Sequence, residues 1–234
     1  ESGVITIGAM PLSRAHILPG TVTAFYRDHP DVRIIIIEGS FPDLIEPLRD
    51  GDIDLLIGAL RQPDGSGDVA QRALFDDRPI VLGRMGHPLA APPAGSPAGT
   101  PAGTPAATPP TAPPGTPPTL DDLARFPWVV PAAGTPLRAQ WERMFTGMGH
   151  RVPHVPVECG SVITIRQILR DSDFLTILSP DQVTVELEAG WLTKIADTPD
   201  GLTRTIGVTT RDGWRPTAMQ RAFIDRINRT AQSG

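Results

Sequence analysis

Three turns of the chain combine a hydroxyl side chain with a proline or glycine, between an apolar strand-like segment and a helix-like one. Ser13 lies in "GAMPLSR", Thr135 in "AAGTP" and Ser161 in "CGSV". Because the first N–H groups of a helix have no partner within it, such a turn offers free N–H donors as well as a hydroxyl. These groups bind carboxylates, phosphates or sugar hydroxyls. The pattern therefore indicates a binding site for a small polar or anionic molecule, if the turns face one another.

An arginine follows two of these turns. Arg14 and Arg138 could neutralise an acidic ligand through a bidentate contact, and the alternative for each is a solvated arginine on a helix face. Each of the three hydroxyls could also simply cap its helix, and taken singly this is the better interpretation. Ser179, in "SPDQ", is interpreted as a cap alone.

The sequence lacks the residue patterns of enzymes and metal sites. Its five histidines form no HxH or HExxH pair, and no Gly-x-Ser-x-Gly elbow or glycine-rich phosphate loop is present. His87, in "GHPLA", is interpreted as structural, and the single cysteine, Cys159, as a buried, inert thiol. We therefore expect no catalytic residue, no metal and no cofactor.

The bulk properties exclude several classes of protein. A formal net charge of -5 on 234 residues gives the chain no basic footprint for nucleic acid. No apolar run approaches the ~18 residues that a membrane span needs. One cysteine allows no intramolecular disulfide, which suits a reducing compartment. The chain enters a strand directly after Gly3, so either a leader has been removed or an upstream domain is missing, and the sequence leaves both open.

Strand-like and helix-like segments alternate along the chain, which predicts an α/β fold with a mainly parallel sheet. Strands are expected at residues 4–9, 32–38, 53–59, 128–130, 155–158, 174–178 and 203–210. Helices are expected to end near Asp28 and at Gly51, to begin at Pro136 and after Ser161, to end at Gly190, and to cover 217–230. The apolar run 32–37 is interpreted as one buried strand.

Residues 92–118 break this alternation. The stretch "PPAGSPAGTPAGTPAATPPTAPPGTPP" holds a large share of the 27 prolines and no charged residue. It cannot bury enough apolar surface to offset the entropy cost of ordering, so we expect a disordered or polyproline-like surface insertion.

Several stretches together resemble the effector-binding domain of LysR-type bacterial transcriptional regulators. They follow one another in the order typical of that family: "VITIGAMPLSRAHILPGTVTAFYRDHPDVRIIIIEG", "LIEPLRDGDIDLLIGAL", "LFDDRPIVLGRMGHPLA", "LDDLARFPWVVPAAGTPLR" and "SDFLTILSPDQVTVELEAGWL". The wording "IGAMPLSR" and "IGALRQP" is similar to the branch that includes galactose-binding-protein and protocatechuate regulators.

The resemblance implies a type 2 periplasmic-binding-protein-like fold, with two Rossmann-like lobes joined by two crossover strands. Lobe I would comprise 1–79 plus 206–234 and lobe II 80–205, with crossovers at 78–84 and 203–207. The winged helix-turn-helix that such regulators use to bind DNA is absent from this chain.

The resemblance also implies that a small acid or sugar binds in a cleft between the lobes. For Ser13, Thr135 and Ser161 taken together, it therefore favours a binding role over a purely capping one. The expected effector contacts are Met10, Pro11, Leu12, Ser13, Thr135, Pro136, Gly160, Ser161 and Thr164, with Arg14 and Arg138 as anion contacts. A cytoplasmic homo-oligomer is implied, dimerising through helix 18–28 and the mate's second lobe, with DNA bound only through the missing domain. The alternatives are a periplasmic solute-binding protein and an enzyme on the same fold.

Overall fold

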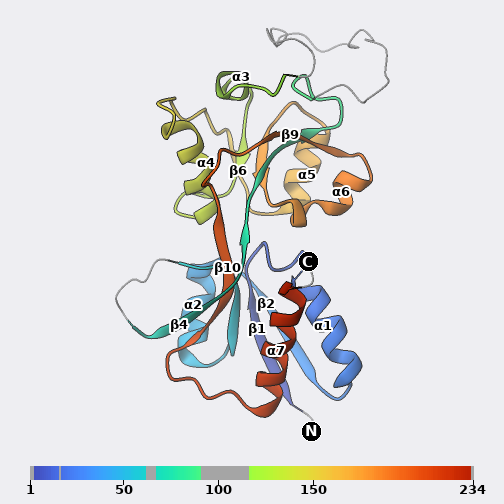
Figure 1. Ribbon diagram of the computed structural model, residues 1–234, viewed down its shortest axis with the longest axis vertical. Coiled ribbons are helices and arrows are strands. Elements are labelled where there is room, and N and C mark those ends of the chain that lie inside the picture. Colours follow the sequence, from blue (N-terminus) through green and yellow to red (C-terminus); the bar gives the residue numbers. More distant parts are fainter. Residues whose placement is uncertain (1–2, 16, 62–66, 91–115, 233–234) are drawn as a thin grey trace. The chain divides into compact units, whose positions relative to one another are not determined.

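The computed structural model describes residues 3–15, 17–61, 67–90 and 116–232. The chain divides into two compact units, of which unit 1 comprises Glu1–Asp77 and Thr203–Gly234 and unit 2 comprises Arg78–Leu202 (Figure 1). The expected lobe limits at 79/80 and 205/206 stay a prediction. Residues 92–115 of the expected insertion lie outside the described residues, and 116–118 have no regular secondary structure.

Unit 1 is built on a five-stranded sheet with the order β2-β1-β3-β10-β4. Its strands are β1 (Val4–Ala9), β2 (Arg33–Glu38), β3 (Leu55–Ala59), β4 (Val69–Asp77) and β10 (Arg204–Arg211). β1 pairs in parallel with both β2 and β3, whereas β10 pairs antiparallel with β3 and β4.

Helices cover both faces of this sheet (Figure 1). The helices are α1 (Ile17–Asp28), α2 (Phe41–Asp50) and α7 (Ala218–Gln232). One face of the sheet packs against α1 and α7, where the rings of Phe25 and Phe223 meet edge to face at 5.0 Å between centroids. The other face packs against α2. As expected, α2 ends at Gly51, whose φ of 88° is the left-handed conformation that glycine favours.

Unit 2 has two small sheets. β5 (Ile80–Arg84) lies between β8 (Thr176–Leu178) and β9 (Leu192–Asp197) and pairs antiparallel with both, while β6 (Val129–Val130) and β7 (Val157–Glu158) pair in parallel. The helices are α3 (Leu120–Ala124), α4 (Pro136–Thr146), α5 (Val162–Arg170), α6 (Thr184–Glu188) and the short 3-10 helix η1 (Pro180–Gln182). Trp128, Trp141 and Phe145 are fully buried and form its aromatic core, with ring centroids 5.4 to 5.8 Å apart.

Two expectations about the strands are wrong. The sheets are mixed rather than mainly parallel, because β4, β5, β9 and β10 follow connections that return the chain antiparallel to its neighbours. The segment 32–38 is not a buried strand, because β2 is an edge strand whose residues are half-buried or exposed. β4 was missed altogether, because charged and polar residues interrupt its apolar pattern.

His87 is structural, as the sequence indicated. Its ring is 2% exposed and packs on Phe126 at 4.6 Å between centroids. Nδ1 accepts a hydrogen bond from the Leu89 N–H at 3.1 Å, so the proton resides on Nε2, which lies 3.2 Å from the Asp173 carbonyl oxygen. Burial lowers the pKa of His87 below its ordinary value of 6.5.

We predict that unit 2 loses stability as the pH falls below about 6.5. The unfolded chain takes up a proton on His87 before the folded chain does, so the free energy of unfolding falls by at most ~1.4 kcal/mol per pH unit for this group. Urea unfolding followed by tryptophan fluorescence at pH 7.5, 6.5 and 5.5 measures this slope. His87→Gln should flatten it and His154→Gln, an exposed control, should not. Equal slopes in all three proteins would contradict the prediction.

Candidate functional site

The carboxyl ends of three strands lie at one edge of the unit 1 sheet. β2, β1 and β3 are adjacent and parallel, so the turns that follow them leave from the same edge. The turn after β1 carries Met10 to Arg14, and α2 begins after β2 with Ser40 as its N-cap. This edge is therefore where backbone donors and side chains from separate segments come together.

Ser13 shapes the turn after β1 from within. It is 0% exposed, its hydroxyl donates to the Met10 carbonyl oxygen at 2.8 Å, and its own carbonyl accepts from the Leu18 N–H at 3.0 Å. Its side chain does not cap α1, since that helix begins at Ile17. Met10 and Leu12 are also buried, and Pro11 is half-buried. Met10 packs closely over Gly58 of β3. A Cβ atom added to Gly58 would lie 2.5 Å from the Cβ of Met10, so a larger residue does not fit there.

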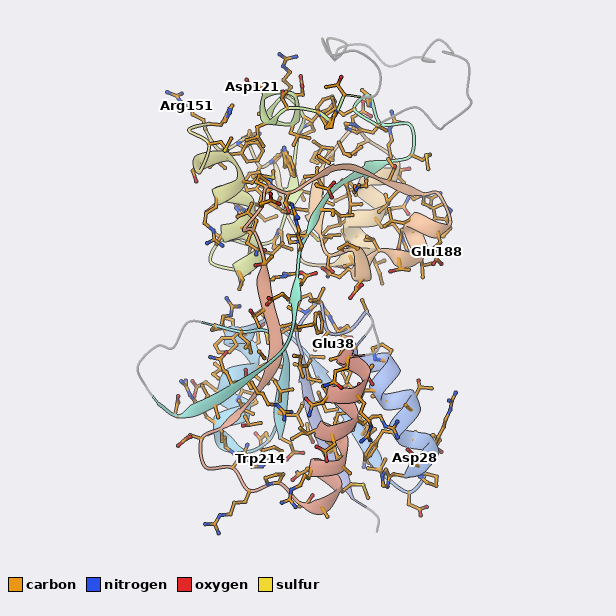
Figure 2. The ribbon with its side chains drawn as sticks, in the orientation of Figure 1. Asp28, Glu38, Asp121, Arg151, Glu188 and Trp214 are labelled. Atoms are coloured by element: carbon orange, nitrogen blue, oxygen red, sulfur yellow. The ribbon has the colours of Figure 1, made fainter. Side chains whose placement is uncertain are left out.

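Arg14 already has an anionic partner. Its Nη1 lies 2.5 Å from Oε2 of Glu38, the last residue of β2. Figure 2 shows Glu38 at the end of unit 1 that is remote from Asp28 and Trp214. The ion pair thus ties the turn after β1 to the carboxyl end of β2.

Unit 2 has a comparable edge. β6 and β7 are parallel, and a parallel bridge between Trp128 and Leu175 places the strand that becomes β8 on the other side of β6. Because all three run the same way, the turns 131–135, 159–161 and 179–182 leave from one edge. The sequence-predicted residues of unit 2 lie in the first two of these turns or in the helix that follows.

Thr135 and Ser161 are both N-caps, as each could have been on sequence alone. The Thr135 hydroxyl accepts from the Arg138 N–H at 3.3 Å and donates to the Ala132 carbonyl at 2.9 Å, and Pro136 begins α4. The Ser161 hydroxyl accepts from the Thr164 N–H at 3.4 Å and lies 3.2 Å from the Thr164 hydroxyl. Thr135 and Pro136 are half-buried, whereas Gly160, Ser161 and Thr164 are exposed. The exposed hydroxyl pair at the start of α5 is thus accessible to a ligand.

Arg138 has a structural role that neither sequence interpretation anticipated. Its side chain is 12% exposed, and its guanidinium lies 2.8 Å from both Glu142 and Glu158. It also donates to the Pro131 carbonyl at 3.2 Å and lies 5.2 Å from the Trp141 ring. Arg138 therefore joins the start of α4 to β7 and to the turn after β6.

The sequence left Ser179 out of the site, although it lies at the carboxyl end of β8. It is the N-cap of η1, as interpreted, and its N–H donates to Gln182 Oε1 at 3.3 Å. Its hydroxyl is buried and has no hydrogen-bond partner among the described residues. A buried hydroxyl without a partner is uncommon in a folded protein, so Ser179 joins the candidate contacts.

Cys159 is half-buried rather than buried. Its thiol lies 3.8 Å from the Ser161 carbonyl and it packs at the margin of the unit 2 core. Among the described residues, no group of three or more histidine, cysteine or acidic side chains could hold a metal ion. His16 lies outside the described residues. No helix in the described ranges is long and apolar enough to cross a membrane.

The geometry of both edges can now be set beside known proteins. A sequence profile for the LysR substrate binding domain matches residues 1–102 and 104–232. The chain belongs to this family. The effector binding domain of QuiR, solved in complex with shikimate, matches with a TM-score of 0.75 at 16% identity, covering 100% of this chain and 99% of that one. The fold is the type 2 periplasmic-binding-protein-like fold of LysR effector-binding domains, as predicted.

Curated relatives of this LysR substrate binding domain are transcriptional regulators, not enzymes. The HTH-type regulator GalR of Pseudomonas putida is 33% identical over 211 residues, covering 90% of this chain and 47% of GalR. PcaQ of Agrobacterium fabrum is 23% identical over 229 residues, covering 97% of this chain and 66% of PcaQ. The chain thus spans between about half and two thirds of the length of these relatives. Matches to regulators do not favour the alternative of a periplasmic solute-binding protein.

We predict that Arg138→Met lowers the free energy of unfolding by about 1 to 3 kcal/mol, because charge-assisted hydrogen bonds of a nearly buried guanidinium are lost. Arg143→Met is the matched control, since Arg143 is exposed on the same helix, and it should change stability by less than about 0.5 kcal/mol. Urea unfolding of both variants measures the difference. Equal stabilities would show that Arg138 does not hold α4 in place.

Proposed function

We propose that this chain is the effector-sensing part of a LysR-type transcriptional regulator, and that it binds a small polar or anionic metabolite. The observation that carries the proposal is that a LysR substrate binding domain places turns with accessible donors at the carboxyl edge of each unit. Helix N-termini and hydroxyls at such an edge suit carboxylates, phosphates or sugar hydroxyls.

The proposed effector contacts lie at the carboxyl edge of each unit's sheet. Met10, Pro11, Leu12 and Ser13 form the turn after β1, and because three of them are buried, their contribution is chiefly shape and backbone groups. Ser161 and Thr164 offer hydroxyls that water already reaches. The proposed set is Met10, Pro11, Leu12, Ser13, Thr135, Pro136, Gly160, Ser161, Thr164 and Ser179. Arg14 and Arg138, the anion contacts that the sequence predicts, are already paired with glutamates.

The relatives support a metabolite of this chemistry. The related QuiR domain was solved with shikimate, a hydroxylated carboxylic acid. An effector acts on the regulator only through its different affinities for two conformations, so we propose that binding shifts the populations of such states on DNA. We also propose a cytoplasmic location and DNA contact through a separate domain, since the net charge of -5 gives this chain no basic footprint for DNA.

We also propose that the chain forms homo-oligomers through α1 and its surroundings. Tyr26 on α1 is 55% exposed, and Ile36 on the edge strand β2 is 44% exposed. Large apolar side chains at an unpaired sheet edge favour association with another surface, and the expected surface is the second unit of another copy.

The binding proposal predicts that a sugar, aromatic acid or small carboxylate raises the melting temperature of this chain. Ligand at 100 times its dissociation constant stabilises by ~2.7 kcal/mol. Ser161→Ala and Thr164→Val should each weaken the affinity by about tenfold, the loss of roughly one hydrogen bond. Thr146→Val at the far end of α4 is the matched control and should bind as the wild type does. A shift that survives both edge variants, or the absence of any shift, would contradict the proposal.

The oligomer proposal predicts that Tyr26→Glu combined with Ile36→Glu yields a monomer in light scattering. The free energy needed to bury the two new carboxylates would exceed the free energy gained from the apolar contact. Ala70→Glu combined with Ala73→Glu adds the same charge to β4, at the opposite edge of the sheet, and should remain oligomeric. A wild-type chain that is monomeric at high concentration, or a double variant that still associates, would show that this surface is not the interface.

A further inference from the structure

Arg61 follows the end of β3 at the carboxyl edge of unit 1. Its guanidinium lies over the ring of Phe41, the first residue of α2, at 5.1 Å from the ring centroid. Phe41 in turn packs against the apolar cluster that contains Met10. Arg61 therefore shares its surroundings with the turn after β1 on which the proposed function rests.

The backbone of Arg61 is fixed by two hydrogen bonds to one side chain. The Arg61 N–H donates to Gln71 Oε1 at 2.9 Å, and Gln71 Nε2 donates to the Arg61 carbonyl at 3.0 Å. Gln71 belongs to β4, so the position at which the arginine side chain starts is set by the sheet. A charged group with a fixed backbone and a ring beneath it needs little reorganisation to receive a ligand.

The guanidinium has no anionic partner within the described residues. Its Nε is buried and makes no hydrogen bond, and burial alone lowers the pKa of Arg61. Every other half-buried arginine of the described ranges has a carboxylate or a carbonyl partner. Those arginines are Arg14, Arg49, Arg84, Arg138, Arg166, Arg204, Arg211 and Arg226.

The acidic residue in the first turn of α2, two residues after Phe41, is already engaged. Asp43 accepts hydrogen bonds from the Ser40 N–H at 2.9 Å and from the Ser40 hydroxyl at 2.5 Å. Its carboxylate thereby caps the N-terminus of α2, and no ion pair between Asp43 and Arg61 is found in the described residues. Even partial burial of a cation costs free energy unless an anion neutralises the charge.

We propose that Arg61 is the countercharge for an oxyanion group of the effector, with the Phe41 ring as the surface against which that group is positioned. This inference rests on the proposed function, since it names the chemical class of the molecule bound at the same edge. Arg14 and Arg138 have their charges balanced by glutamates, so the acid group is taken by Arg61 in their place. A planar guanidinium presents paired N–H donors that match a carboxylate or phosphate.

The test measures binding of benzoate, succinate and inorganic phosphate to the whole chain by calorimetry, with benzamide and succinamide as uncharged counterparts. At least one acid should bind the wild type, and Arg61→Gln should weaken it about ten- to hundredfold while Arg61→Lys weakens it less. Arg72→Gln removes one positive charge from the exposed face of β4 and is the matched control. Binding of phosphate alone would assign a phosphate ester, and binding of the organic acids alone would assign a carboxylate.

Two results would overturn the inference. One is that no acid binds the wild type more tightly than it binds Arg61→Gln, or that the amides bind as well as the acids. The other comes from the ligand-free chain, where Arg61→Met should raise the melting temperature because an uncompensated charge is removed. A clear fall in melting temperature would show that the guanidinium is structural.

A neutral sugar whose affinity depends on Ser161 and not on Arg61 would overturn this inference and leave the proposed function standing. Acid binding that depends on Arg61 and not on Ser161 or Thr164 would support this inference and overturn the proposed contacts at Ser161 and Thr164.

Discussion

The parallel pairing of β1 with β2 and β3, and of β6 with β7, is the constraint on which the candidate site depends. It brings the ends of strands that are far apart in the sequence to one edge in each unit, and it makes the following helices start there. The antiparallel strands β10 and β5 complete the sheets without adding turns to these edges. The donors at each edge therefore have positions that the sheet determines, as rigid recognition of a small molecule requires.

Charge is distributed unevenly around these edges. Arg14 and Arg138 each form an ion pair that joins two segments of the edge, and the nearly buried pair of Arg204 with Asp77 joins β10 to β4. These arginines stabilise the arrangement of the turns. Arg61 is half-buried and has no such pair among the described residues, and this difference in charge balance is the ground on which we propose a binding role for it. In unit 2, the buried Ser179 hydroxyl likewise has no hydrogen-bond partner among the described residues.

Much of this architecture follows from the sequence, and the remainder depends on contacts that sequence does not encode locally. The caps at Thr135 and Ser161, the end of α2 at Gly51 and the structural role of His87 were predicted, because capping and turn chemistry act over a few residues. The exposure of β2 was not, because whether an apolar strand is central or at an edge depends on strand order. The partners of Arg138 lie four and twenty residues away in the sequence, so local patterns do not predict them. Whether Arg61 has a carboxylate partner depends on the tertiary structure, which brings none to it among the described residues.

The central claim is that a small acid binds at the carboxyl edge of the unit 1 sheet, with Arg61 as its countercharge. The most direct measurement is the amide ¹H–¹⁵N spectrum of the labelled chain during titration with an acid that raises its melting temperature. The account predicts progressive shifts of the same affinity in the turn 10–14 and at Arg61, with little change at Thr146 or Ala70. Shifts centred away from this edge, or no shift at Arg61, would contradict it.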